Sequence, residues 1–261
     1  MDLIEQLSLL LISYLANTLS ALAGGGAGLL QFPVLLFLGL SFGTALATHK
    51  IASVALGIGA TLRHLKEGNL DWRFASYILF CGLPGVIIGA NLVLSFPEAW
   101  AILSLGILTT GLGLYSRFKT QLGMQLELCN QDLRGMLIGG IGLFLIGGLN
   151  GSLTSGTGLF VTLWLVRWFG LDYQRAVAYT LILVGMFWNA TGAVAISLQT
   201  APQWPWLPVL LVGSLLGAYS GAHLGLSKGN RVIKKAFELL TLLVGLKLIW
   251  DGISLLLTSS A

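Results

Sequence analysis

A run of glycines between two apolar segments sets the strongest constraint on how this chain can fold. Residues 22–33 read Leu-Ala-Gly-Gly-Gly-Ala-Gly-Leu-Leu-Gln-Phe-Pro, and a weaker copy, Asn-Gly-Ser-Leu-Thr-Ser-Gly-Thr-Gly-Leu-Phe, covers residues 150–160. Consecutive glycines interrupt a helix, and in hydrocarbon they leave backbone groups that nothing nearby satisfies. Such a break persists in a membrane only where it faces protein, water or a ligand.

The rest of the chain is too apolar for a soluble protein. Of its 261 residues, 56% are hydrophobic and 9% are charged, and the mean hydropathy is +0.87. Because a membrane-spanning helix needs about 20 mostly apolar residues, this composition predicts an all-α polytopic membrane protein without a soluble domain. Ten apolar segments can be marked, at residues 3–23, 27–41, 44–62, 74–94, 97–115, 135–150, 157–170, 174–198, 205–226 and 235–257.

The segments at 27–41 and 157–170 are short for a full crossing. Each either crosses the membrane with its glycine loop near one surface, or forms a re-entrant hairpin with the segment before it. Both arrangements return the chain to the same side of the membrane. The sequence therefore predicts about eight to ten spans.

Basic residues concentrate in alternate loops and predict the orientation of the chain. The loops near residues 63–73, 117–134, 167–175 and 228–235 hold 12 of the 14 Lys and Arg, and the loops between them hold none. Under the positive-inside rule these basic loops are cytoplasmic and both termini lie outside. We therefore interpret the net charge of +4 as a topology signal, and expect no nucleic-acid partner.

The two halves of the chain resemble each other. Residues 26–30 align with 156–160, residues 45–48 with 176–179, and residues 85–92 with 217–224, at offsets of 130 to 132. We predict one membrane transport domain, residues 1–261, built from inverted repeats at about 3–115 and 135–257 with a cytoplasmic linker at 116–134. Each repeat holds five segments, an odd number, so the two enter the membrane from opposite faces. Inverted repeats with broken helices are typical of secondary transporters, in which the breaks meet near the midplane and form the binding site.

Several short motifs also follow one another in a fixed order. They are Gly24-Gly-Gly-Ala-Gly-Leu-Leu-Gln-Phe-Pro33, Ala45-Leu-Ala-Thr-His-Lys-Ile51, Ala60-Thr-Leu-Arg63, Asp71-Trp-Arg73 and Gly156-Thr-Gly158. Together they resemble the TauE/SafE family of sulfite and organosulfonate exporters over nearly the whole chain. The resemblance implies a multi-pass permease of the bacterial inner membrane. The chain departs from the family pattern at His49, where Asn is frequent, and at Leu181, where Lys is frequent.

Lys50 is the side chain that the sequence singles out for anion binding. Neither its own segment nor the two beside it contain Asp or Glu, and a charge inside a membrane usually has a function or a partner. A bound anion is therefore its natural counterion. The alternative is that Lys50 extends its long side chain to the outer surface. Given the family resemblance, we favour substrate binding.

Other groups near the glycine loops complete the predicted site. Backbone N–H groups at helix starts favour an anion, and His49 is either a donor to an oxyanion, an acceptor of a coupling proton, or a packed neutral side chain. The alternative is that the glycines only allow close helix crossing and that each hydroxyl bonds to its own helix. The predicted substrate-binding residues are Gly24, Gly25, Gly26, Gly28, Gln31, Thr48, His49, Lys50, Ser155, Gly156, Thr157, Gly158, Tyr179 and Thr180, with Asn150 and Ser152 as further neutral donors.

The sequence favours transport over catalysis. It contains no nucleotide-binding loop, catalytic triad or metal-ligand spacing, so we predict no enzyme activity, cofactor or metal site. The expected partners are a small anion and the lipid bilayer, and the oligomeric state stays open, with a homodimer as one option. We predict export of sulfite, sulfoacetate or a related organosulfonate by alternating access, because an interior-negative membrane drives anions outward. The alternatives are proton-coupled uptake of thiosulfate or another small anion, and a non-transporting scaffold or assembly factor.

Overall fold

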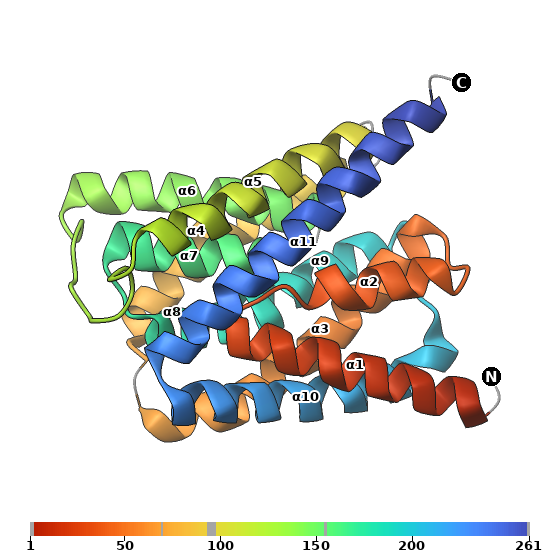
Figure 1. The fold of residues 1–261 in the computed structure, drawn as a ribbon, viewed down its shortest axis with the longest axis horizontal. Coiled ribbons are helices and arrows are strands. Elements are labelled where there is room, and N and C mark those ends of the chain that lie inside the picture. Colours follow the sequence, from red (N-terminus) through yellow and green to blue (C-terminus); the bar gives the residue numbers. More distant parts are fainter. Residues whose placement is uncertain (1–2, 69, 93–97, 154–155, 260–261) are drawn as a thin grey trace.

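Helices make up the regular structure of the described residues, which are 3–68, 70–92, 98–153 and 156–259 of a computed structural model (Figure 1). They are α1 (Leu3–Ala23), α2 (Ala27–Phe37), α3 (Phe42–His64), α4 (Trp72–Leu92), α5 (Glu98–Phe118), α6 (Leu133–Leu153), α7 (Thr157–Phe169), α8 (Tyr173–Tyr179), α9 (Asn189–Ser197), α10 (Leu207–Lys228) and α11 (Asn230–Ser259). A π-helical segment, Thr180–Trp188, joins α8 to α9. All ten predicted apolar segments are helical, with boundaries that differ from the prediction by up to five residues.

Most of these helices are long enough to cross a membrane. Within the described ranges, seven are sufficiently long and apolar: those that begin at Leu3, Phe42, Trp72, Leu133, Tyr173, Trp204 and Asn230. By contrast, α2 has 11 residues and α7 has 13, which correspond to about 16 and 20 Å of helix. Both are shorter than the roughly 30 Å hydrocarbon core of a bilayer. The chain is an all-α polytopic membrane protein.

The two short helices form hairpins that turn inside the bundle. In Figure 1, α2 runs back toward the end at which α1 begins, and α7 runs back toward the end at which α6 begins. The turn between α1 and α2, Gly24 to Gly26, is buried. This geometry corresponds to the re-entrant arrangement, one of the two that the sequence left open.

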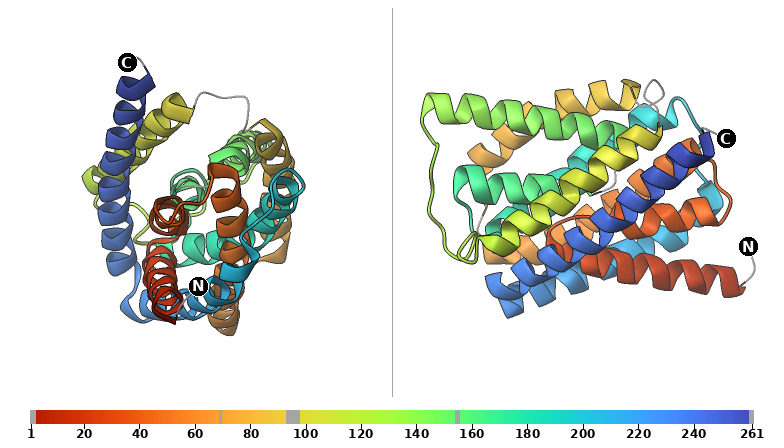
Figure 2. Two further views of the ribbon diagram at one scale, coloured as in Figure 1. Left: turned by 90° about the vertical axis from the view of Figure 1, so that its right-hand side faces the viewer. Right: turned by 45° about the horizontal axis from the view of Figure 1, so that its top comes forward.

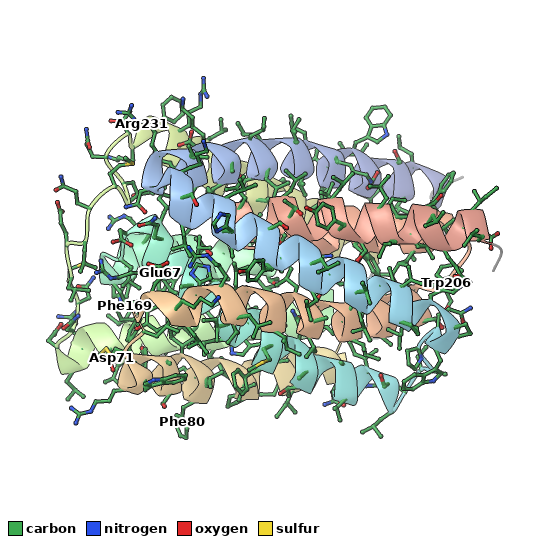
Figure 3. All side chains as sticks on the ribbon, turned by 90° about the horizontal axis from the view of Figure 1, so that it is seen from below. Glu67, Asp71, Phe80, Phe169, Trp206 and Arg231 are labelled. Carbon is green, nitrogen blue, oxygen red and sulfur yellow. The ribbon has the colours of Figure 1, made fainter. Side chains whose placement is uncertain are left out.

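The loops rich in Lys and Arg gather at one end of the bundle. Figure 3 shows Glu67, Asp71 and Arg231 at that end and Trp206 at the other, and both termini lie at the end opposite to the linker (Figure 1). We call the end formed by residues 63–73, 117–134, 167–175 and 228–235 the basic end. Its assignment to the cytoplasm remains a prediction of the positive-inside rule.

Three helix pairs account for much of the packing: α1 with α10, α4 with α6, and α5 with α11. Figure 2 shows the α5–α11 pair along one side of the bundle. Glycines lie at these crossings: a Cβ on Gly89 of α4 would meet the carbonyl oxygen of Gly148, and a Cβ on Gly217 of α10 would meet that of Tyr14. Lipid gives helices little hydrophobic reason to associate, so close backbone approach at small residues supplies the attraction through van der Waals contact.

This packing predicts the effect of adding one methyl group. We expect Gly89→Ala to lower the free energy of unfolding by about 1–3 kcal/mol, because the new Cβ overlaps the backbone of α6. Gly111→Ala in α5 is the matched control, since a Cβ there meets nothing within 4 Å. Thermal unfolding of the purified proteins in detergent measures both. Equal stability of the two variants would contradict the close crossing of α4 and α6.

Candidate functional site

The two glycine breaks lie against each other in the middle of the bundle. A Cβ built on Gly25 would lie 2.6 Å from the carbonyl carbon of Gly158 and 2.7 Å from the backbone nitrogen of Leu159. Gly25 also has a φ of 136°, a backbone conformation that residues with a side chain rarely adopt. Both features require glycine at this position. The two breaks therefore meet, as the sequence led us to expect.

Two helices begin at this meeting point and run in opposite directions (Figure 1). Gly26 directly precedes α2 and Gly156 directly precedes α7, both with left-handed backbone, and neither helix start is capped by a side chain. The first N–H groups of a helix have no carbonyl partner four residues earlier, although in α7 the N–H of Leu159 bonds back to the carbonyl of Gly156 at 2.9 Å. Together with the helix dipole, they make a helix start attractive to an anion. The positive ends of two helices thus point at one place.

A cavity of about 40 Å³ lies between these helix starts. This is roughly three times the space that a water molecule needs by the same measure. The cavity brings together eight of the predicted residues: Gly25, Gly26, Gly28, His49, Asn150, Thr157, Gly158 and Thr180. The remaining lining residues are Ser20, Ala27, Ser53, Leu56, Leu181, Val184, Gly185 and Asn189.

His49 is held by hydrogen bonds on both ring nitrogens. Its Nδ1 lies 2.9 Å from Gln31 Oε1, and its Nε2 lies 3.1 Å from Ser53 Oγ. The Gln31 amide donates to Ser13 Oγ at 3.0 Å, and Ser13 donates to the carbonyl of Leu210 at 2.9 Å. Because the Gln31 oxygen can only accept, we assign the proton of the ring to Nδ1. Gln31 therefore orients His49 and does not line the cavity.

Lys50 is fully buried and does not extend to the outer surface. Its Nζ donates to the carbonyl oxygen of Asn150 at 2.8 Å and lies 3.4 Å from Asn150 Oδ1. The amide of Asn150 in turn donates to Thr157 Oγ1 at 2.8 Å. Among the described residues, none of the ion pairs includes Lys50. The positively charged side chain of Lys50, on α3, is thus hydrogen-bonded to Asn150 in the second glycine break, and Asn150 lines the cavity.

The two predicted residues at the edges of the breaks have structural contacts. The carbonyl of Gly24 accepts a hydrogen bond of 2.6 Å from Thr162 Oγ1 on α7, and this hydroxyl lies 2.9 Å from Thr180 Oγ1. Gly156 provides the left-handed residue before α7. Ser155 lies outside the described residues.

Three other predicted donors lie away from the cavity. Thr48 Oγ1 donates to the carbonyl of Thr44 and accepts from the backbone of Gln203 at 2.8 Å, near the Trp206 end. Ser152 donates to its own helix, at the carbonyl of Gly148. The hydroxyl of Tyr179 accepts a 2.7 Å bond from the backbone N–H of Asp71 at the basic end.

Sequence reasoning missed three polar residues of the cavity, Ser20, Ser53 and Asn189, and one backbone feature. Ser53 follows His49 by four residues, a spacing that places both on one helix face, so this residue was detectable. Asn189 is a polar residue directly after the apolar stretch 181–188. The π-helical segment Thr180–Trp188 has no sequence signal that we could use, although π-turns recur at functional sites.

In the described part of the chain, no group of three His, Cys, Asp or Glu side chains could hold a metal ion.

Known proteins match this chain along most of its length. The family model described as "Sulfite exporter TauE/SafE" matches residues 9–248. A "Probable membrane transporter protein" of Haemophilus influenzae is 28% identical over 240 residues, covering 92% of each chain. The Escherichia coli protein YfcA is 29% identical over 94% of this chain and 89% of its own, and YunE of Bacillus subtilis is 23% identical over 94% and 97%. No solved structure matches. This chain is a multi-pass membrane transporter that belongs to the TauE/SafE family.

Proposed function

We propose that this transporter binds a small sulfur-containing oxyanion, with sulfite as the best-fitting substrate, in the cavity between α2 and α7, and exports it by alternating access. The convergence of two uncapped helix starts on one buried cavity carries this proposal. Backbone N–H groups at a helix start bind oxyanions without any charged side chain. The sulfite exporters for which the family model is named supply the substrate class.

The charge around the cavity favours an anion. Its described lining residues include no Asp or Glu, and Lys50 places its ammonium group on Asn150, which lines the cavity. Ser20, Ser53 and Thr157 add hydroxyl groups to the lining. A charge-assisted hydrogen bond is about twice as strong as a neutral one, so a substrate that accepts from several of these groups gains most when it is negatively charged.

The size of the cavity favours a compact ion. A volume of about 40 Å³ holds roughly three waters at the minimum that each requires, which is close to the four non-hydrogen atoms of sulfite. Sulfoacetate and longer organosulfonates exceed this space in the described conformation. They would need the cavity to widen before binding.

The direction of transport follows from the membrane potential. One elementary charge crossing 100 mV changes the free energy by about 2.3 kcal/mol, and an interior-negative membrane drives anions outward. Export therefore requires no coupling ion. The second candidate is proton-coupled uptake of thiosulfate or a similar anion, and His49 favours it because this side chain lines the cavity and an imidazole can exchange a proton.

Flux measurements in proteoliposomes separate these functions. For the exporter we expect sulfite flux that rises with the imposed potential and persists without a proton gradient. Uptake coupled to protons requires the gradient instead. Thermal shift with sulfite, sulfate, thiosulfate and sulfoacetate tests binding itself, because a ligand at 100 times its Kd stabilises the folded state by about 2.7 kcal/mol. A flat response to every anion, together with absent flux, would support the non-transporting scaffold and refute the proposal.

A further inference from the structure

A second cavity, of about 390 Å³, lies at the basic end of the bundle. Asp71 and Phe169 line it, and Figure 3 shows both residues toward that end. Its walls come from the start of α4, the end of α7, α8 and the linker before α6. It is about ten times as large as the central cavity, and none of the proposed binding steps uses it.

Two arginines face this cavity. Arg175 Nη1 donates to Asp172 Oδ2 at 2.7 Å, whereas Arg73 takes part in none of the ion pairs found among the described residues. Asp71 also lines the cavity, and its Oδ1 accepts a 2.8 Å bond from the backbone N–H of Arg73. The four stretches of the basic end together hold 12 Lys and Arg against five Asp and Glu. The field at the mouth of the cavity therefore attracts anions.

Four aromatic side chains, those of Phe74, Tyr77, Phe169 and Tyr179, line this cavity. The ring of Phe74 lies edge-on to Tyr179 at 5.3 Å and to Phe169 at 5.0 Å between centroids, and Tyr77 stacks on Phe74 at 5.8 Å. The Tyr179 hydroxyl is held by the backbone N–H of Asp71. Tyr179 lines this cavity, and the next residue, Thr180, lines the central one. Two consecutive residues thus belong to the walls of different cavities.

The linker forms the outer wall. The linker contributes Leu126, Leu128 and Gln131 to the lining of the cavity. Backbone hydrogen bonds from the residues between these three hold the linker in place. The N–H of Glu127 donates to the carbonyl of Gly170 at 2.8 Å, and the N–H of Cys129 donates to that of Phe169 at 3.1 Å. This wall is therefore held against the end of α7.

We propose that this second cavity is an entry site for the transported anion, with Arg73 and Arg175 as its binding residues and Tyr179 as the gate to the central cavity. This inference deepens the proposed anion transport and rests on it. The entry site is wide enough for an organic sulfonate, whereas the central cavity holds only a compact ion. Selection by size then takes place at Tyr179, after the anion has been captured by charge.

Cysteine reactivity tests the charge of the entry site without any need for transport. Leu128→Cys is introduced with Cys81→Ser and Cys129→Ser, and its reaction rates with anionic and cationic methanethiosulfonates are compared. Each rate is divided by the rate of the same reagent with a free thiol. On this scale we expect the anionic reagent to react about tenfold faster than the cationic one. Adding Arg73→Gln and Arg175→Gln removes this preference, and the matched pair Arg73→Lys and Arg175→Lys preserves it. Ser41→Cys, exposed near the opposite end, reports the background. Equal rates for both reagents at position 128 overturn the arginine assignment.

A second labelling experiment tests the gate. Leu56→Cys, in the same cysteine-free background, places the thiol in the wall of the central cavity. We expect Tyr179→Ala to raise its labelling from the basic end about tenfold, which corresponds to a barrier lower by about 1.4 kcal/mol, and Tyr179→Phe to leave it low. If Tyr179→Ala unfolds, Tyr179→Val gives the same readout. Unchanged labelling in the folded variant refutes the gate, and this outcome leaves wild-type sulfite binding and flux intact. If the wild-type protein showed neither sulfite binding nor sulfite flux, that result would instead refute the proposed function.

Discussion

Replacing Lys50 with methionine is expected to reduce sulfite flux by about thirtyfold while the protein stays folded. Two unit charges about 8 Å apart attract each other by roughly 2 kcal/mol at an effective dielectric constant of about 20, which corresponds to a factor of about thirty. The ammonium of Lys50 is the positive charge bound to the second glycine break. Its removal leaves the helix starts as the remaining attraction for the anion.

The stability of this variant distinguishes a binding role from a structural one. Methionine fills the space beside Gly192 in which the Lys50 side chain packs, and removing a buried unpaired charge offsets part of the cost of leaving Asn150 without its donor. We expect the unfolding temperature to stay near that of the wild type. Lys247→Met is the matched control, because Lys247 pairs with Asp251 on an exposed face of α11 and exposed pairs contribute little. Wild-type flux in folded Lys50→Met would contradict the role of this charge.

Gly25→Ala is expected to destabilise the protein by about 2–5 kcal/mol and to abolish stabilisation by sulfite. Positive φ costs a residue with a side chain about 1–2 kcal/mol, and the overlap of its Cβ with Gly158 adds about 1–3 kcal/mol. Relief of this overlap requires α2 and α7 to separate. The cavity between their starts would then lose its shape.

The matched control isolates the contact from the backbone strain. Gly68 also has positive φ, 65°, but a Cβ there meets nothing within 4 Å. Gly68→Ala should therefore show only the backbone cost of about 1–2 kcal/mol and retain the sulfite-induced shift in unfolding temperature. If both alanine variants lose the same stability and still respond to sulfite, the two breaks do not form the binding site.

The helices of this fold were predictable because hydrocarbon leaves few options. A segment that buries its backbone in lipid must be helical, so hydropathy located all ten segments. The turns were harder to place, since a short segment such as 157–170 fits two arrangements with the same loop charges. The structure separates them through contacts between Gly25 and Gly158, residues far apart in the sequence. The inverted repeat remains a prediction from sequence.

The glycine breaks in the sequence predicted part of the candidate site, whereas the positions of individual side chains were harder to predict. Both glycine breaks identified residues that line the cavity. Thr48 and Tyr179 lie next to such residues in the chain but point elsewhere, because successive helical residues are about 100° apart and because Gln203 and Asp71 bind their hydroxyls. Partners of this kind come from distant loops, so no local pattern reveals them.

Each of the two glycine breaks is held by a side chain from the other half of the chain. The carbonyl of Gly24, before the linker, is held by Thr162, which follows the linker. The carbonyl of Asn150, after the linker, is held by Lys50, which precedes it. During synthesis the turn at Gly24 therefore lacks its hydrogen-bond donor until α7 has been made. Neither half of the chain contains all the hydrogen-bonding groups of its own turn. A half expressed alone could form these hydrogen bonds only with a second chain.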